Sequence, residues 1–597
     1  MKSPFLRQFY SASCLILASS TLLTAQTATW QDAAPGNWEE PANWSWTGTI
    51  PPTSLPDTAT TVLINAGTAV VQDTTQSAGV LTMNTARIEI TKGSTGGVLG
   101  VSGTFHIGSL AARTGSVLVD GLGSILNKTG NAQMHIGSAG TGSMVVSNEG
   151  RVNVVGTTHV GLGSSSGATG VGTLTVNTAG RYVSSSTFIL GYRGNGTLNV
   201  ESAGYVKTGS SYIGGFGQDA NRRGGTGTVN VTGEGSRWEA TVLYVGHSGT
   251  GTMNIENSGV VASTSTAAIG HFNGGVSSSA PVGTVPTPPI YGTGTVNIRT
   301  GGLWQSTASI TIGGNGGTGT MNLASAGSVL VNSGNGTITL GDQGSLNIGA
   351  DPLLPEAFPA APGIVNAATI TGATDRAVTL FHTDMTGAYH LTKTGAAAGA
   401  HVTLAGSMKL NALAGTTTLI GANTLTGGSS IGGYTGTEAR LILSHATALG
   451  SGPVLVQNNG TLEVAAGVAT TTLSSLTLQG GSALAFDAHP VGGTDAPKFE
   501  ISTMLSLVTN PEEKITIYLN NAAAITDPEL YDWAFLKTTG GITGYDPDLF
   551  EVISDVPDFY VFERDGFLVL GMAVIPEPGR AVLLLGGLMG LGSRRRR

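Results

Sequence analysis

The chain has 597 residues, a net charge of −9 and 92 glycines, and only 11% of its residues are charged. So few charges beside 40% apolar residues argue against disorder, and glycine without a strict triplet excludes collagen. No basic stripe occurs outside the last four residues, so we expect no nucleic-acid partner. Thr, Val, Ile and Leu alternate with Gly, Ser and Asn, which predicts an all-β protein of short strands and many turns.

Residues 1–25 have the pattern of a secretory signal peptide. Lys2 and Arg7 precede an apolar stretch at 14–23, which is followed by a suitable cleavage motif, Leu-Thr-Ala. The only cysteine, Cys14, lacks the apolar stretch that a lipoprotein signal would place before it. We therefore expect export, and a mature chain without disulfides or thiol chemistry.

Residues 26–100 precede the first clear repeat and are predicted to form an N-terminal cap. A stack of β-coils needs a cover over its open end, and large aromatic side chains can supply one. Carbohydrate stacking is the alternative use of these rings. The residues concerned are Trp30, Trp38, Trp44 and Trp46.

Residues 101–349 repeat a unit of the form Gly-[Ser/Thr]-apolar-x-apolar, which is closed by an apolar-Gly pair 18 to 22 residues after its first glycine. Insertions fall between that pair and the next unit. A constant core with insertions at one place predicts a parallel β-helix, or β-solenoid, of about 24 residues per coil. Within a strand we expect Leu198 and Val200 to point inward. The units begin at Gly115, Gly142, Gly172, Gly196, Gly227, Gly251, Gly294 and Gly319.

The repeat also predicts two polar columns. His106, His135 and His159 each precede an apolar-Gly pair, so they should stack outward on consecutive coils about 5 Å apart. Such imidazoles could bind a transition metal weakly or repel one another below pH ~6, but we favour simple stacking without a metal. The second column is an amide ladder that hydrogen-bonds along the axis, made of Asn199, Asn230, Asn254, Asn297 and Asn322.

A polysaccharide lyase or glycosidase is the enzymatic alternative for such a fold. Its site would need two carboxylates about 5 to 10 Å apart, or an acidic calcium site with a basic residue. Glu201 and Glu256 share a position, but Thr232 lies between them and no basic partner recurs. The acids of the repeats are predicted to stand singly, so we expect no enzyme, no cofactor and no metal. These acids are Glu149, Glu201, Glu234, Glu239 and Glu256.

The C-terminal half contains three further regions. Residues 350–499 hold a second repetitive block, and residues 500–573, richer in charge and aromatics, are predicted to form a β-rich cap. In the tail, 574–597, a short apolar segment would span about 18 Å as a helix, too short for a ~30 Å membrane core but sufficient for transient anchoring. The motif residues of this tail are Pro576, Glu577, Pro578, Arg594, Arg595, Arg596 and Arg597.

The order Pro-Glu-Pro, apolar helix and basic cluster resembles the PEP-CTERM sorting signal of Gram-negative bacteria. The resemblance implies transient anchoring in the inner membrane, processing by an exosortase, and an association with exopolysaccharide or biofilm. The unit of residues 101–349 resembles the repeat of type V secretion autotransporter passengers and PEP-CTERM proteins, and residues 415–464 resemble the autotransporter-associated β-strand repeat. These resemblances imply an exported, non-enzymatic surface scaffold or adhesin-like protein that contacts exopolysaccharide or neighbouring cells.

Overall fold

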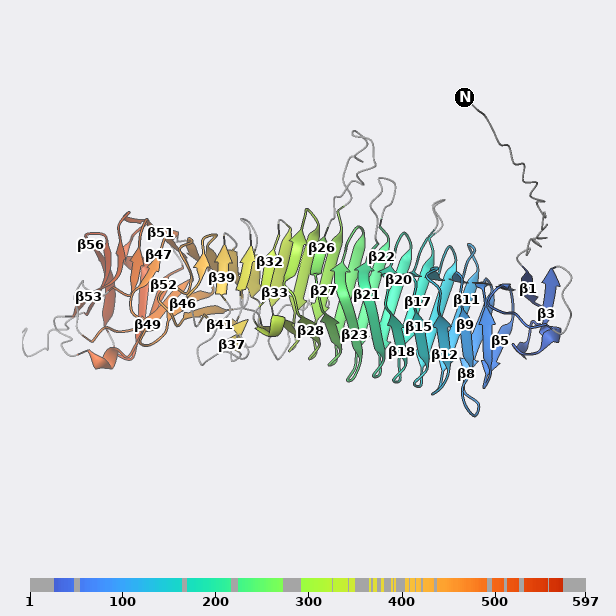
Figure 1. The fold of residues 1–597 in the computed structure, drawn as a ribbon. Coiled ribbons are helices and arrows are strands. Elements are labelled where there is room, and N and C mark those ends of the chain that lie inside the picture. The colour runs from blue at the N-terminus through green and yellow to red at the C-terminus, as the bar shows by residue number, and fades with distance from the viewer. Residues whose placement is uncertain are drawn as a thin grey trace, which may run out of the picture.

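The protein's structure, a computed structural model, is an elongated stack of β-strands (Figure 1). The predicted leader, 1–25, and the predicted tail with its apolar helix, 574–597, lie outside the described residues. No helix in the described part is long and apolar enough to cross a membrane. The description covers residues 26–47, 54–163, 169–215, 224–271, 291–324, 326–334, 336–341, 343–348, 364–366, 369–372, 377–380, 388–389, 391–392, 403–406, 409–413, 415–419, 422–433, 438–490, 497–508, 513–525, 531–556 and 558–572.

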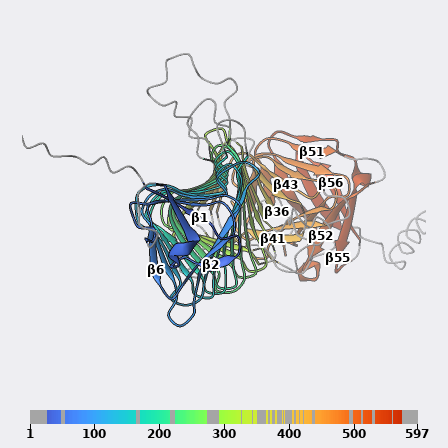
Figure 2. The ribbon, with the colours of Figure 1, turned by 90° about the vertical axis from the view of Figure 1, so that its right-hand side faces the viewer.

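Each coil contributes one strand to each of three parallel sheets, here called the first, second and third columns. The coil of β14 (Thr141–Ser147), β15 (Arg151–Val154) and β16 (Thr158–Val160) pairs in register with the next coil. In that next coil Gly172 lies opposite Gly142, and so the repeat glycines align along the stack. Figure 2 looks along the N-terminal coils, whose strands lie behind one another. The predicted β-solenoid is confirmed.

The first column runs through most of the chain. Its strands are β2 (Pro35–Asn37), β5 (Thr68–Gln72), β8 (Ala86–Thr91), β11 (Thr114–Asp120), β14, β17 (Val171–Val176), β20 (Asn195–Glu201), β22 (Thr226–Thr232), β24 (Thr250–Glu256), β27 (Thr293–Ile298), β30 (Thr318–Leu323), β33 (Gly344–Ile348), β36 (Ala377–Leu380), β40 (Lys409–Ala412), β43 (Ser429–Ile431), β45 (Val454–Val456), β48 (Leu476–Gln479), β51 (Leu505–Val508) and β54 (Ile542–Thr543).

The second and third columns follow the first in the coils from β5 to β36, and in two of these coils their strands merge into one. The second column holds β6 (Thr75–Ala78), β9 (Val98–Val101), β12 (Ile125–Lys128), β15, β18 (Arg181–Ser184), β25 (Val260–Ser263), β28 (Leu303–Ser306), β31 (Ser328–Val331), β34 (Ile364–Asn366) and β38 (Leu391–Thr392). The third holds β4 (Thr61–Ile64), β7 (Val80–Met83), β10 (Phe105–Ile107), β13 (Met134–Ile136), β16, β19 (Phe188–Leu190), β26 (Ala267–His271), β29 (Ile310–Gly314), β32 (Thr337–Leu340), β35 (Thr369–Gly372), β39 (Thr403–Gly406) and β42 (Thr424–Leu425). The merged strands are β21 (Tyr205–Ile213) and β23 (Arg237–Val245).

A fourth sheet begins at β37, and from β45 onward it and a fifth sheet take the second and third places in the chain order of each coil. The fourth sheet is β37 (Ala388–Tyr389), β41 (Gly415–Leu419), β44 (Ala439–Leu443), β46 (Gly460–Val464), β49 (Ala483–Asp487), β52 (Ile515–Asn520) and β55 (Phe550–Ser554). The fifth is β47 (Thr471–Leu473), β50 (Phe499–Ile501), β53 (Asp532–Thr538), β57 (Phe567–Met572) and β56 (Phe559–Arg564). Short 3₁₀ turns are η1 (Pro41–Asn43), η2 (Asn332–Gly334), η3 (Ala522–Ala524) and η5 (Pro547–Leu549).

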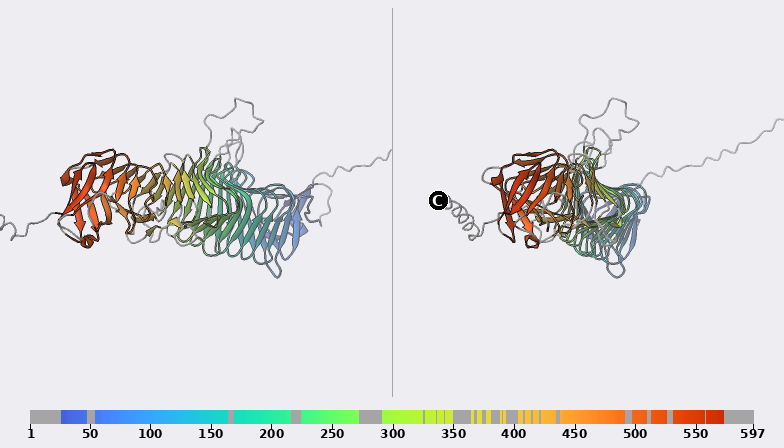
Figure 3. Two further views of the ribbon diagram at one scale, coloured as in Figure 1. Left: turned by 60° about the vertical axis from the view of Figure 1, so that its left-hand side comes forward. Right: turned by 90° about the vertical axis from the view of Figure 1, so that its left-hand side faces the viewer.

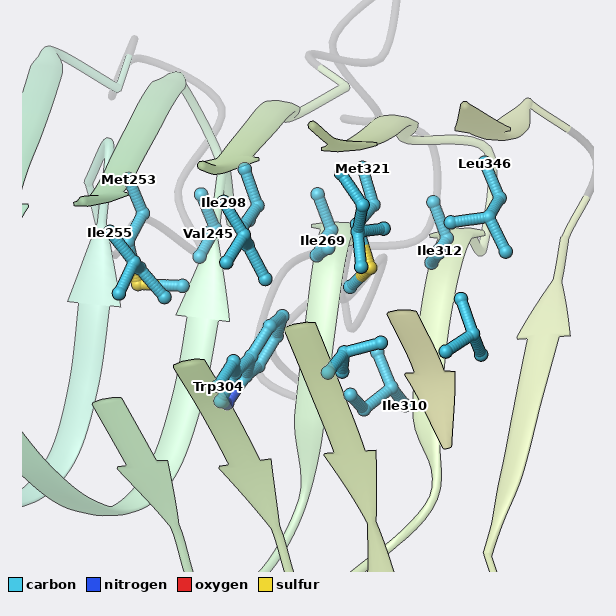
Figure 4. Packing of buried hydrophobic residues seen from close by; sticks show 14 of the residues in the cluster. Val245, Met253, Ile255, Ile269, Ile298, Trp304, Ile310, Ile312, Met321 and Leu346 are labelled. Atoms are coloured by element: carbon cyan, nitrogen blue, oxygen red, sulfur yellow. The ribbon is translucent and has the colours of Figure 1, made fainter. Parts of the chain in front are cut away.

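One contiguous hydrophobic core runs along the inside of the stack, from Ala28 to Leu570. Strand alternation places Leu198 and Val200 in it, both fully buried, as predicted. Figure 4 shows side chains such as Met253 and Trp304 filling the interior between the columns. Because every coil buries its apolar face only against its neighbours, stability depends on stacking rather than on a globular centre.

Two kinds of glycine form the corner between the third column and the first column of the next coil. Gly161, in an apolar-Gly pair, has a φ of 74°, a conformation that favours glycine. Gly196, which opens a unit, lies so close to the end of β16 that a Cβ would sit 2.2 Å from the carbonyl oxygen of Val160. The repeat therefore needs its first glycine for space and its second for backbone conformation.

Insertions at this corner leave the stacking unchanged. Residues 272–290 intervene between β26 and β27, yet Gly251 on β24 still lies opposite Gly294 on β27. The strand core of each coil fixes the register, and the corner absorbs the variation in length.

Antiparallel strands close the N-terminal end. β1 (Thr27–Trp30) pairs antiparallel with β3 (Trp44–Thr47) and parallel with β4. Trp30, Trp38 and Trp44 are buried, and their rings make edge contacts with centroids 5.0 Å and 4.8 Å apart. Burial gives these three rings a capping role rather than a surface for carbohydrate stacking. Parallel pairing already begins at β1 and β2, so most of the region predicted as a cap, 26–100, belongs to the stack.

The C-terminal end is also closed by antiparallel pairing. The coils continue through residue 500, the expected start of a separate cap, as far as β53 and β54. β53 and β56 then flank β57 in antiparallel pairs, which covers the last parallel strand of the fifth sheet. Figure 3 shows this end, in red, from two further sides.

Candidate functional site

The residues predicted to act in sorting lie outside the described part of the chain. This applies to the whole tail motif, so its role stays a prediction from sequence. The residues are Pro576, Glu577, Pro578, Arg594, Arg595, Arg596 and Arg597.

The asparagine column is an amide ladder, as predicted. Asn230 donates from Nδ2 to Oδ1 of Asn199 at 2.9 Å, and Asn254 does the same to Asn230 at 2.8 Å. The ladder extends one coil further than predicted, because Asn347 donates to Asn322 at 2.8 Å. Each amide in the series satisfies its neighbour, so the ladder ties successive coils together.

The histidine column is in register but is more buried than expected. His106, His135 and His159 lie opposite one another on β10, β13 and β16. The Nδ1 atoms of His106 and His135 are 3.0 Å apart, and the rings of His135 and His159 have centroids 5.2 Å apart. His135 and His159 are each only 6% exposed. In the described part of the chain, both ring nitrogens of His159 lack a hydrogen-bond partner.

Burial sets the charge state of this column. Desolvation lowers the pKa of His135 to about 3, with smaller repulsion from His159 and His106, and lowers the pKa of His159 to about 4. These imidazoles are therefore neutral at physiological pH. Across the described residues, no group of three or more His, Cys, Asp or Glu side chains is placed to hold a metal ion.

The column continues as a run of aromatic rings that sequence reasoning missed. His159 contacts Tyr192 at 5.5 Å, and Tyr212 stacks on Tyr244 at 5.3 Å. His247 contacts both Tyr212 and Tyr244. The sequence signal was a ring directly after the glycine of an apolar-Gly pair, at Tyr192 and His247. Rings packed edge to face on neighbouring coils stabilise the outer wall of the stack.

Two acids predicted to stand alone are in fact paired. Glu201 and Glu256 do flank Thr232 in register, as expected. Glu256, however, binds Arg299 of the next coil at 2.7 Å. The prediction that no basic residue accompanies it was wrong, because Arg299 holds the position of Glu256 in the next unit, five residues after the opening glycine Gly294.

Glu239 is the second corrected acid. Its carboxylate binds Arg237 at 2.8 Å and accepts a hydrogen bond from the hydroxyl of Tyr205 at 3.0 Å. Burial opposes ionisation, but these hydrogen bonds outweigh it and lower the pKa of Glu239. The ion pair lies within β23, and the hydrogen bond from Tyr205 joins it to β21.

A hollow of about 280 Å³ opens on the outer face of the fourth sheet. Its floor includes Ala485, which lies in register between Glu463 and Tyr518. Tyr518 is 40% exposed, whereas Ala485 is 3% exposed. A small side chain between two long ones creates the depression. Other residues that line it are Thr416, Glu438, Arg440, Thr461 and Asn520.

The polar groups of this hollow differ in what they bind. Arg440 forms an ion pair with Glu463, using both Nε and Nη2. Within the described residues, the side chains of Thr461, Tyr518 and Asn520 have no hydrogen-bond partner. Alternation along β52 could have indicated that Tyr518 points outward, but its neighbours across the sheet could not be read from the sequence.

Comparisons with known proteins give little further guidance. The sequence matches no family model and no curated protein. Among solved structures, the chain is similar to a TibC-catalysed, hyper-glycosylated fragment of TibA, at 13% identity and a TM-score of 0.29. The match covers 76% of this chain and 99% of that one. A likeness of this degree carries no functional argument.

Proposed function

We propose that the protein is an exported, non-enzymatic rod of the cell surface, a scaffold or adhesin-like protein. The observation that carries this proposal is the single core that runs from Ala28 to Leu570 and is closed by antiparallel strands at both ends. Such an architecture gives a stiff, extended molecule whose coils present a long outer wall. A rod of this kind suits contact with a partner at a distance from its point of attachment.

The proposed location in the cell rests on the sequences of the two ends of the chain. Residues 1–25 would direct export, and the tail at 574–597 would hold the chain transiently in the inner membrane until an exosortase removes it. The partners would be extracellular polysaccharide or a neighbouring cell surface.

The non-enzymatic part of the proposal is supported by how the outer wall uses its polar groups. Glu256 and Glu239 are in ion pairs, the asparagines bond to one another, and the column of His135 is desolvated and neutral. In the described part of the chain, these side chains contact one another and do not form an acid-base pair that faces a substrate.

Cell fractionation tests the proposed location of the protein and the cleavage of its tail. The full chain and a variant lacking residues 575–597 would be followed with an antibody to the coils. We expect the full chain at the surface with a shortened C-terminus, and the truncated variant in the periplasm. An uncleaved tail together with unchanged surface delivery of the truncated variant would overturn the sorting proposal.

A further inference from the structure

The hollow on the fourth sheet combines an exposed ring with unused polar groups. Tyr518 presents 40% of its surface beside the alanine floor at Ala485. The hydroxyl of Thr461 and the amide of Asn520 line the same space without protein partners in the described part of the chain. By contrast, the asparagine ladder of the N-terminal coils satisfies its own amides.

We propose that this hollow binds a neutral saccharide. The face of an aromatic ring carries partial negative charge, which attracts the C–H bonds on the face of a pyranose laid against Tyr518. Sugar hydroxyls both donate and accept, and the lining offers the guanidinium of Arg440 as a donor and the carboxylate of Glu438 as an acceptor. The inference deepens the proposed function, and rests on it, by naming what the surface rod would hold.

Charge and size narrow the ligand class. The lining carries the carboxylate of Glu438 and the guanidinium of Arg440, and the charge of Arg440 is already balanced by Glu463. An acidic sugar would meet net negative charge there, so a neutral one is favoured. A volume of about 280 Å³ is at the lower limit of small-molecule sites. It suits one or two rings of a longer chain that continues out of the open side.

Titration calorimetry of the purified full chain tests the proposal. The probes are cellotetraose, maltotetraose and mannotetraose, with tetragalacturonate as the acidic comparison. Two variants alter the hollow. Tyr518→Ala removes the aromatic ring, and Ala485→Leu fills the floor while every polar side chain is kept. Tyr518→Phe keeps the ring. Tyr560→Ala is the matched control, because Tyr560 is 48% exposed but does not line the hollow.

We expect a neutral tetrasaccharide to bind with a Kd at or below the millimolar range. Tyr518→Ala should weaken binding at least tenfold, Ala485→Leu should abolish it, and Tyr518→Phe and Tyr560→Ala should leave it within about threefold. Circular dichroism would verify that each variant is folded. Binding of tetragalacturonate alone, no binding of any probe, or equal effects of Tyr518→Ala and Tyr560→Ala would overturn the proposal. None of these results depends on where the protein resides in the cell, so failure here leaves the fractionation test intact.

Discussion

The outer walls of the N-terminal and C-terminal coils use polar residues in opposite ways. Around β22 asparagine recurs on successive coils, and each amide finds its hydrogen-bond partner one coil away. Around β49 the fourth sheet places Glu463, Ala485 and Tyr518 in one row, with no residue repeated. The repeated asparagines use their amide groups to bond to one another, whereas a row without repetition leaves polar side chains beside it open to a ligand.

The largest expected effect comes from the corner that makes the repeats stack. Gly196→Ala would place a Cβ 2.2 Å from a backbone oxygen, so we expect a loss of about 3 kcal/mol or more in the stability of the adjoining coils. Gly100→Ala is the control, since the nearest atom to its Cβ would be 3.8 Å away. Hydrogen exchange followed by mass spectrometry would measure both. Equal protection of β20 in the two variants would contradict the role given to the corner.

Acid should loosen the N-terminal coils. An unfolded histidine binds a proton near its ordinary pKa of 6.5, but folded His159 does so only near 4. The folded state is thus favoured above pH 6.5, and its stability falls as the pH decreases from 6.5 towards 4, by about 3 kcal/mol for one such histidine. Denaturant unfolding of these coils at a series of pH values would show the slope.

A matched pair of variants assigns this slope to the column. His159→Phe keeps a buried ring but cannot be protonated, so it should flatten the pH dependence by about one proton. His445→Phe changes an exposed histidine outside the column and should leave it unaltered. The desolvation argument would fail if both variants flattened the curve to the same degree.

The amide ladder should give the smallest effect of the three. Asn254 donates to Asn230 and accepts from Asn297, so Asn254→Ala removes two hydrogen bonds and should cost about 2 kcal/mol. Asn153→Ala removes one bond at an exposed position and should cost about 0.5 kcal/mol or less. The measurement is local hydrogen exchange on β24 and β15. A ladder that contributes nothing would make the two costs equal.

Spacing alone predicted the fold and both polar columns, because a solenoid places residues one coil apart on top of one another. It missed the first coils for a simple reason: Ala86 occupies the position that Gly115 holds in the next coil, so the opening glycine was absent. In the C-terminal coils Ser429 and Val454 begin strands of the same column without glycine.

The ion pair of Glu256 with Arg299 could have been read from the repeat, since both residues stand five positions after the opening glycine of consecutive units. Other features depended on side chains that no motif position links. The burial of His135 and His159 depends on how closely the neighbouring rings pack against them, and the depth at Ala485 depends on the length of its neighbours. Periodicity shows which residues share a row, but it does not show which neighbours each side chain contacts or how deeply it is buried.

Because the corner between the third and first columns accepts insertions, the length of the rod does not depend on the segments inserted there. Adding or deleting one whole coil would change the reach of the molecule by a step of ~4.8 Å, the spacing of adjacent strands. Adding residues between the apolar-Gly pair and the next unit would leave that reach unchanged, as the in-register pairing of Gly251 with Gly294 indicates. The number of coils thus sets the length of the rod, and the insertions at the corner set what its surface carries, so the two can vary independently.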